Sequence, residues 1–220
     1  MAAPQTFPTP TIVPLGDSAL LVRFGTVLTD AANRAAIALA LALDRNPIAG
    51  VTEVVPNLVS VLLRYEPGTG PSPAAIAGEL RLRLFALDDE APLTTHWTIP
   101  VSFDGPDLDA VSAALGMPPE RFVAAHNARP LRVLATGFAP GFVYCGLHAE
   151  DLVLPRRTEV RPAVPPGSVL FAAGQTAITA TEMPTGWHVI GHADFANFDP
   201  ARDLPTRLSA GDMITFEATR

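Results

Sequence analysis

The chain has 220 residues, 48% hydrophobic and 17% charged, which is enough for one large domain or two small ones with buried cores. Its net charge of −7 gives it no electrostatic reason to bind nucleic acid or an anionic membrane surface, and we expect neither partner. All 15 basic residues are arginines. Chemistry that needs a lysine amine, such as a P-loop or a Schiff base, is therefore excluded on this chain.

The cysteine content and the N-terminal sequence bear on the cellular compartment. A single cysteine, Cys145, excludes an internal disulfide and a cysteine-rich zinc site. The N-terminal MAAPQTFPTP has neither the basic flank nor the apolar stretch of a signal peptide. The longest apolar run, residues 35–43, is far shorter than the roughly 20 residues of a membrane span. These features predict a cytoplasmic protein.

The first 90 residues alternate between strand and helix patterns. Strands are expected at residues 18–24, 51–55 and 58–65, and helices at 31–44 and 73–87. Asp30 and Ser72 are the expected helix caps. We interpret the order as β-β-α-β-β-α, which predicts a small α/β sandwich with two helices on one face of a sheet.

A polar, proline-broken stretch near residue 90 marks the expected domain boundary, giving domains of residues 1–90 and 91–220. In the second domain, strands are expected at 96–101, 131–136, 169–172, 177–180, 187–190 and 213–217, and short helices at 107–115 and 119–128. Short strands between Gly and Pro turns are typical of a β-barrel. The predicted fold class is therefore α+β, a small sandwich followed by a β-barrel.

A glycine- and aromatic-rich stretch, residues 137–146, follows one of these strands. Its glycines would let the backbone approach another group closely, with Phe138, Phe142 and Tyr144 as walls of a site. The alternative is a barrel corner filled by core aromatics. Cys145 and His148 could be imagined as a nucleophile and its base, but a lone cysteine among apolar neighbours favours inert packing.

Three arginines, Arg156, Arg157 and Arg161, lie within six positions of an otherwise acidic chain. Forked guanidinium groups suit a carboxylate or phosphate. If the segment is extended, Arg157 and Arg161 share one face and Arg156 takes the other. The alternative is a solvated loop partly neutralised by Glu159.

Further polar residues follow downstream. Gln175 and Thr176 could present an amide and a hydroxyl to a polar ligand, or form a satisfied polar corner. His188 and His192 are four residues apart, a metal-ligand spacing on a helix but roughly 13 Å apart on the strand expected here. We therefore expect no metal site.

Several of these motifs, in this order along the chain, resemble one protein family. They are residues 14–22, 50–56, 137–142, 155–157, 164–169, 174–176, 186–187, 190–191 and 198–200. The series resembles the family of the 5-oxoprolinase B subunit, also labelled allophanate hydrolase subunit 1 or kinase A inhibitor, from Ile12 to Phe216. The combination of Gly-Phe-x-Pro-Gly-Phe with a later Gly-Gln-Thr is the most specific part of the likeness.

The resemblance implies a cyclophilin-like β-barrel after the small N-terminal domain. It implies ATP-dependent opening of 5-oxoproline to glutamate together with a homologous C-type subunit and an A-type subunit. ATP would then be used by the assembled complex, with no cofactor on this chain. A related module forms the carboxyltransferase part of urea carboxylase, and another branch inhibits a sporulation histidine kinase. The alternatives are therefore a part of a urea carboxylase or allophanate hydrolase system, or a regulator that binds protein without catalysis.

The resemblance also implies a set of site residues. The matched positions are His126, Arg156, Arg157, Arg161, Gln175 and Thr176. His126 is the candidate acid or base, the arginines would neutralise an anion, and Gln175 and Thr176 would orient a small amide or lactam. Tyr144 and His192 complete the candidate substrate-binding set. The chain departs from the family pattern at Cys145, Leu147, His148, Ala173, Ala177 and His192, which puts the substrate in question.

Overall fold

The computed structural model describes residues 7–68, 70–87 and 94–219. The chain divides into two compact units, Met1–Leu93 and Thr94–Arg220. The predicted boundary at residue 90 lies outside the described residues. Of the helices described, none is long and apolar enough to cross a membrane.

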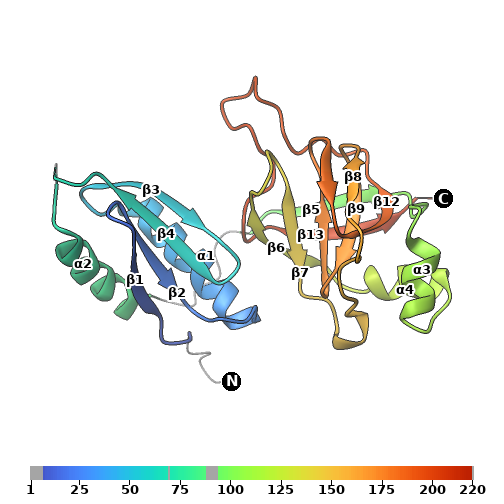
Figure 1. Cartoon of the computed structure of the whole chain (residues 1–220), viewed down its shortest axis with the longest axis horizontal. Coiled ribbons are helices and arrows are strands. Elements are labelled where there is room, and N and C mark those ends of the chain that lie inside the picture. The colour runs from blue at the N-terminus through green and yellow to red at the C-terminus, as the bar shows by residue number, and fades with distance from the viewer. Residues whose placement is uncertain (1–6, 69, 88–93, 220) are drawn as a thin grey trace. The chain divides into compact units, whose positions relative to one another are not determined.

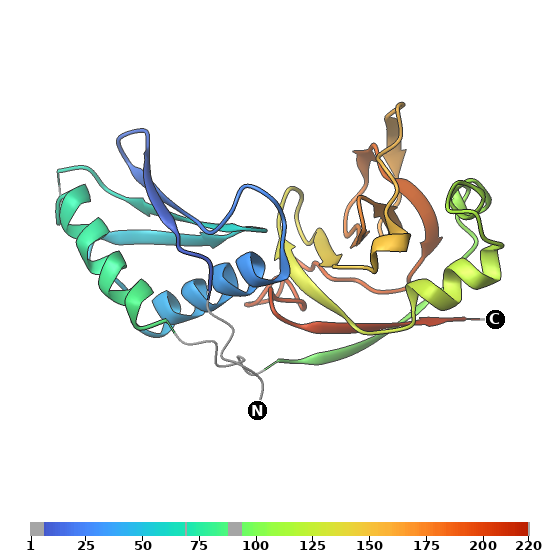
Figure 2. The same cartoon turned by 90° about the horizontal axis from the view of Figure 1, so that it is seen from below.

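The N-terminal unit is a four-stranded antiparallel sheet with two helices in the order β-β-α-β-β-α (Figure 1), and its first strand lies before the strand ranges that the sequence predicts. Its elements are β1 Thr11–Leu15, β2 Ala19–Arg23, α1 Asp30–Arg45, β3 Val51–Pro56, β4 Ser60–Tyr65 and α2 Pro73–Phe85. The strand order is β1-β2-β4-β3, and both helices lie on one face of the sheet (Figure 2). Apolar side chains of β2, β4 and the two helices form one buried cluster there.

The helix caps follow the local sequence with one correction. The Ser72 hydroxyl accepts a hydrogen bond from Ala75 N, and Pro73 occupies the first turn of α2, as predicted. In α1 the cap is Thr29, whose hydroxyl accepts from Ala32 N, and not the predicted Asp30. Asp30 instead begins the helix, where a carboxylate suits the positive end of the helix dipole.

The C-terminal unit is built on a seven-stranded sheet with the order β12-β9-β10-β7-β6-β13-β5. Its elements are β5 His96–Val101, α3 Leu108–Ala114, α4 Pro119–His126, β6 Leu131–Thr136, β7 Val143–Gly146, the 3-10 turn η1 Glu150–Leu152, β8 Arg161–Val164, β9 Ser168–Ala172, β10 Gln175–Ile178, β11 Met183–Thr185, β12 His188–His192 and β13 Met213–Ala218. Neighbouring strands are antiparallel except for the parallel pair β13 and β5. β8 and β11 form a separate two-stranded sheet.

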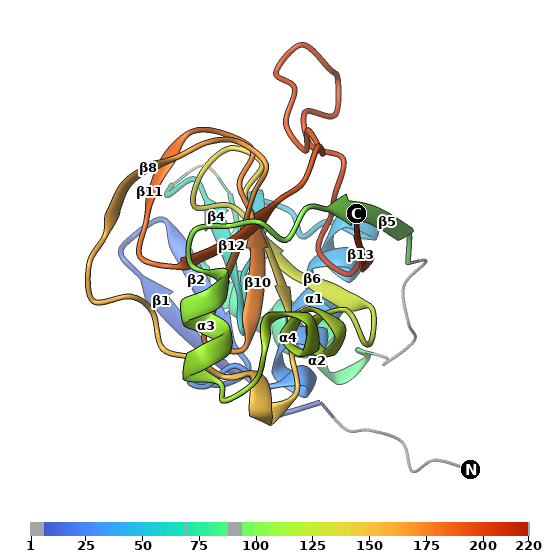
Figure 3. The ribbon, with the colours of Figure 1, turned by 90° about the vertical axis from the view of Figure 1, so that its right-hand side faces the viewer.

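The large sheet curls until its two edge strands, β5 and β12, are joined (Figure 3). Ser102, directly after β5, exchanges two backbone hydrogen bonds with His192, of 2.8 and 2.9 Å. The chain then continues along β12, with Gly105 N donating to Ile190 O and Asp107 N donating to Val189 O. We call this junction, residues 102–107 against β12, the seam.

The strands of this sheet alternate between two apolar faces, as a period of two requires. Val169 and Phe171 of β9 point into the main core of the unit. Leu170 and Ala172 point to the opposite face, where they join Tyr144 and residues of β8 and β11. The two faces decide which candidate residues can meet.

Gly105 is required by the close approach at the seam. A Cβ at this position would lie 2.4 Å from both Ile190 C and Val189 O, which are backbone atoms that cannot rotate away. We expect Gly105→Ala to lower the free energy of unfolding by about 2–3 kcal/mol. Trp97 and Trp187 are the two tryptophans of the chain. Both lie in the C-terminal unit, so denaturation followed by their fluorescence reports that unit alone.

The matched control is Gly186→Ala, because a Cβ at Gly186 has nothing within 4 Å. Its free energy of unfolding should stay within about 0.5 kcal/mol of wild type. Equal stability of the two variants would contradict the described seam.

Candidate functional site

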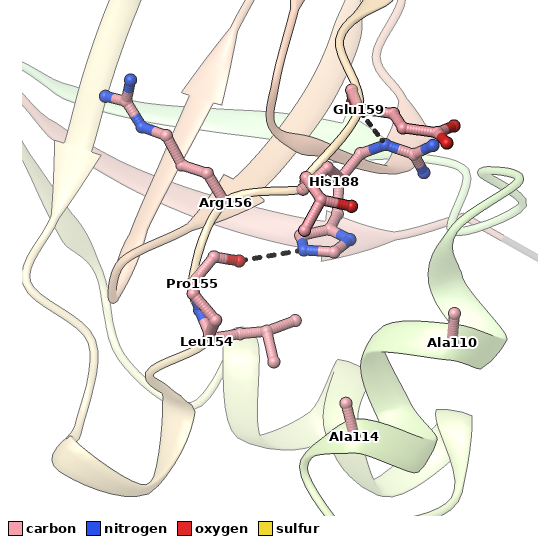
Figure 4. Close-up of a pocket in the computed structure, with 9 residues that line it drawn as sticks. Ala110, Ala114, Leu154, Pro155, Arg156, Glu159 and His188 are labelled. Atoms are coloured by element: carbon pink, nitrogen blue, oxygen red, sulfur yellow. Dashed lines mark hydrogen bonds between the residues drawn. The ribbon is translucent and has the colours of Figure 1, made fainter.

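The segment of residues 154–161, which we call the arginine segment, runs along the outside of the curled sheet. It lies between a row of aromatic rings and a groove beside α3. It is held to the unit by Arg157 N, which donates to Gly186 O, and by His188 Nε2, which donates to Pro155 O over 3.1 Å. Figure 4 shows the Arg156 side chain pointing away from His188 and Glu159. This is the alternation that an extended segment predicts.

Arg157 and Arg161 both bind one carboxylate, that of Asp107 at the seam. Arg157 Nη1 and Arg161 Nη2 donate to Asp107 Oδ1, and Arg161 Nη2 also lies 3.0 Å from Oδ2. Asp107 Oδ2 accepts a further hydrogen bond of 2.8 Å from Val189 N. Asp107 is only 6% exposed, so these contacts replace most of the water that would otherwise hydrate its carboxylate.

The surroundings of Asp107 favour its charged form. Burial by itself would raise the pKa of the carboxyl, but the Val189 amide and the two guanidinium groups outweigh burial and lower it. Asp107 is therefore ionised at neutral pH. Two guanidinium charges against one carboxylate leave a net charge of +1 in this cluster.

The predicted three-arginine anion patch therefore needs correction. Two of its members already have a carboxylate partner, and this partner is Asp107 rather than the Glu159 that the alternative interpretation named. The Glu159 contribution is a backbone carbonyl, which accepts from Arg157 Nε at 3.4 Å. Within the described residues, Arg156 is the member of the set that has no carboxylate in ion-pair range.

Arg156 lies at the end of a row of aromatic rings on the outer face of the sheet. Its guanidinium carbon is 5.6 Å from the centre of the Trp187 ring. Trp187 is followed by Tyr144 at 6.0 Å, and Tyr144 by Phe142 at 4.8 Å between ring centres. Burial raises the pKa of the Tyr144 phenol, and the charge of Arg156 offsets only part of this. Arg156 and a protonated Tyr144 hydroxyl thus offer a cation and a donor on one face.

Gln175 and Thr176 do not share a site, because neighbouring residues of a strand point to opposite faces. Gln175 is on the outer face, as Tyr144 is. Gly146 faces the same way as Tyr144 because it lies two residues further along the strand, and a Cβ on Gly146 would lie 3.4 Å from Gln175 Cγ. Its Oε1 is buried without a hydrogen-bond partner among the described atoms. Thr176 points into the core. The expectation that both residues orient one ligand is therefore wrong.

Thr176 links two buried histidines inside the curled sheet. Its hydroxyl oxygen lies 2.7 Å from His126 Nε2 and 2.8 Å from His148 Nε2. His126 Nδ1 is 2.6 Å from Asn127 Oδ1, an acceptor. The network therefore assigns the proton of His126 to Nδ1, so that Thr176 donates to His126 and His148 Nε2 donates to Thr176.

Both histidines are neutral in this network. Burial lowers the pKa of His126 to about 4, although the hydrogen bond to Asn127 opposes the shift. Burial, followed by the neighbouring His126 and Arg129, lowers the pKa of His148 to about 3. His126 has no exposed surface and is packed against rings of Phe103, Phe122 and Phe216. It therefore cannot reach a substrate on the surface, and the predicted acid–base role at the arginines does not fit its position.

The remaining candidates lie elsewhere. His192 ends β12 at the seam, four residues after His188. Its ring packs on Gly167, where a Cβ would lie 2.7 Å from it. Cys145 is fully buried in the main core and burial raises the pKa of its thiol, in agreement with inert packing. On the other side of the arginine segment, a groove of about 370 Å³ is lined by Ala110 and Ala114 of α3, residues 154–159 and His188.

Sequence reasoning missed three residues of these arrangements. The sequence predicts Asp107 only as the start of a helix, His148 only as an imagined base for Cys145, and Trp187 only as part of a strand and of a family motif. A usable signal existed for Asp107, because two arginines on one face of an extended segment need a counter-charge once they are partly buried. No such local signal marks the contact of His148 with His126.

The two buried histidines should make the C-terminal unit sensitive to acid. The unfolded chain binds their protons near pH 6.5, whereas the folded chain does so only at about 4 and 3. From pH 6.5 down to about 4 the unfolded state thus binds more protons, and the free energy of unfolding should fall by up to about 1.4 kcal/mol per pH unit for each histidine. His148→Gln should flatten this slope in tryptophan-detected denaturation. His96→Gln, which changes an exposed ring, should leave it unchanged.

Asp107 should contribute stability through its two arginines. We expect Asp107→Asn to lower the free energy of unfolding at pH 7 by about 2 kcal/mol, less than for a fully buried pair because both arginine side chains keep some exposure. Since its folded pKa is lowered, this contribution should be present above about pH 4 and vanish as the pH falls through the folded value. Asp109→Asn, at an exposed position two residues away, is the control and should change stability little.

The chain matches known proteins over most of its length. A family model described as carboxyltransferase domain, subdomain C and D, matches residues 10–208. The chain is 31% identical over 215 residues to the 5-oxoprolinase B subunit of Bacillus subtilis (strain 168), covering 92% of this chain and 90% of the relative. It is 35% identical over 209 residues to the 5-oxoprolinase B subunit of Escherichia coli O157:H7, covering 92% and 93%.

Solved structures share the fold of this chain. The crystal structure of TTHA0988 superposes with a TM-score of 0.81 at 37% identity, covering 92% of this chain but only 40% of that chain. The Kluyveromyces lactis urea amidolyase gives a TM-score of 0.75 at 16% identity, covering 96% of this chain and 15% of that one, a likeness of fold alone. As the motifs predicted, the chain belongs to the carboxyltransferase subdomain C and D family, which its relatives among the 5-oxoprolinase B subunits represent.

Proposed function

We propose that this chain is the B-type subunit of a cytoplasmic, ATP-dependent complex that opens 5-oxoproline to glutamate. The two relatives above are named as the B subunit of 5-oxoprolinase and match over nine-tenths of both chains, which supports this choice. A homologous C-type subunit and an A-type subunit are its partners in the proposal. ATP is used by the assembled complex. The proposal includes a cyclophilin-like barrel for the curled sheet and a sandwich for the N-terminal unit.

The observation that carries the proposal is that Arg156, which has no carboxylate in ion-pair range among the described residues, stacks on the Trp187 ring that also contacts Tyr144. 5-Oxoproline carries a carboxylate on its lactam ring, and a guanidinium binds a carboxylate through charge-assisted hydrogen bonds. The neutral Tyr144 hydroxyl can donate a second hydrogen bond. Stacking on Trp187 holds the Arg156 side chain in place, so less conformational entropy is lost on binding.

In the reaction, the lactam C–N bond breaks while water supplies a hydroxyl to the carbonyl carbon and a proton to the nitrogen. This chain would bind and orient the anion. Its buried histidines lie on the opposite face of the sheet from Arg156, so the group that moves the proton is proposed to come from a partner subunit.

Arg156→Ala tests this assignment. In the complex assembled with its C-type and A-type subunits, we expect kcat/KM for 5-oxo-L-proline, measured by substrate-dependent ADP release, to fall about 10- to 100-fold. Arg121→Ala, at an exposed position of α4, is the control and should retain wild-type turnover.

Wild-type turnover of the Arg156→Ala complex would remove Arg156 from the site. A chain that inhibits histidine-kinase autophosphorylation and binds no C-type subunit would replace the enzyme proposal with the regulator alternative.

A further inference from the structure

The turn between β6 and β7 exposes a phenylalanine in an unfavourable backbone conformation. Phe138 is 79% exposed and has a φ of 78°. A positive φ is a steric outlier for a bulky side chain. Neither backbone preference nor burial therefore accounts for a phenylalanine at this position. Such outliers gather at binding and catalytic sites, where the surroundings hold them.

The surroundings of this turn hold its conformation firmly. A Cβ on Gly141 would lie 2.6 Å from Phe198 Cβ and 2.7 Å from Ala180 Cβ, so the turn packs directly on two other segments. Asn197 Nδ2 donates to Gly141 O over 2.8 Å, and Gly137 N donates to Phe142 O over 3.0 Å. The backbone on both sides of Phe138 is therefore held by contacts with other segments.

The exposed ring is continuous with the proposed substrate site. Phe138 lies 5.8 Å from Phe142, the first ring of the row that leads through Tyr144 to Trp187 and Arg156. The loop that braces the turn, residues 197–207, exposes a second large apolar side chain, Leu204, at 79%. This loop projects beyond the sheet (Figure 1). The turn that carries Phe138 therefore adjoins a loop that carries another exposed apolar side chain.

We propose that Phe138 is the anchor through which a second polypeptide of the complex binds this chain, at the end of the aromatic row opposite Arg156. This inference rests on the proposed function and adds the docking surface to it. The occupant is the polypeptide that corresponds to the part of TTHA0988 outside the match, since this chain covers only 40% of that protein. In TTHA0988 the same fold is thus joined to further sequence, which this chain would recruit as a separate subunit. A rigid aromatic is the kind of residue that dominates such interfaces.

The experiment co-expresses this chain with the protein from its own genome that matches the remaining part of TTHA0988. The affinity of the purified pair is then measured by titration calorimetry. We expect Phe138→Ala to weaken binding by about 30-fold or more, and Phe138→Trp to retain binding within about 5-fold. Phe85→Ala is the matched control, because Phe85 is an equally unshielded ring, 95% exposed, at the end of α2.

A second variant separates binding from folding. Phe138→Gly removes the ring but suits the positive φ, so its unfolding midpoint should stay within about 2 °C of wild type while binding is lost. If wild type binds the partner and Phe138→Ala binds it equally well, the docking inference is overturned and the proposed function stands. If wild type binds no such polypeptide, the proposed function is overturned and the docking inference with it. Self-association that depends on Phe138 would also overturn the inference.

Discussion

The contacts of the Asp107 carboxylate are the interactions on which the arrangement of the C-terminal unit depends. It accepts the Val189 amide at the seam and holds Arg157 and Arg161 of a segment some fifty residues away. One side chain thus joins the closure of the curled sheet to the position of the arginine segment. Among the described residues, the third arginine, Arg156, has no carboxylate in ion-pair range, and it is the one that the proposed function assigns to the ligand. A cluster that resembles an anion site in the sequence is therefore largely a set of ion pairs within the unit.

The two faces of the sheet divide the polar residues by role. Inside, Thr176 satisfies His126 and His148, and all three are removed from solvent. A buried polar network of this kind specifies one packing of the core, because any shift would leave a donor or acceptor unpaired. Outside, Arg156 and Tyr144 keep access to solvent. The inner network is therefore out of reach of a surface ligand, whereas the residues of the outer face that the proposed function uses are accessible.

The sequence predicted the strands of residues 96–101 and 131–136 to the residue, and the cap at Ser72, because these depend on local pattern and local hydrogen bonds. The family was predictable from motif order. The site was predicted only in part. The alternation of Arg156 and Arg157 followed from strand geometry, and the same rule applied to Gln175 and Thr176 would have separated them. The partner of the arginines and the burial of His126 depend on contacts between segments distant in sequence, which no local pattern contains.

The aromatic row gives a physical reason for a site that needs a second chain. Arg156 and Tyr144 lie on an open face, where water weakens a charge-assisted hydrogen bond. Phe138 and Arg156 lie at opposite ends of the same row of contacting groups, so a polypeptide bound at Phe138 would exclude water from Arg156 only if it extends along the whole row. For such an extended partner, binding of the anion and binding of the polypeptide would favour each other, because each removes water that the other must displace. An arrangement of this kind couples substrate recognition to assembly with no conformational change in the sheet.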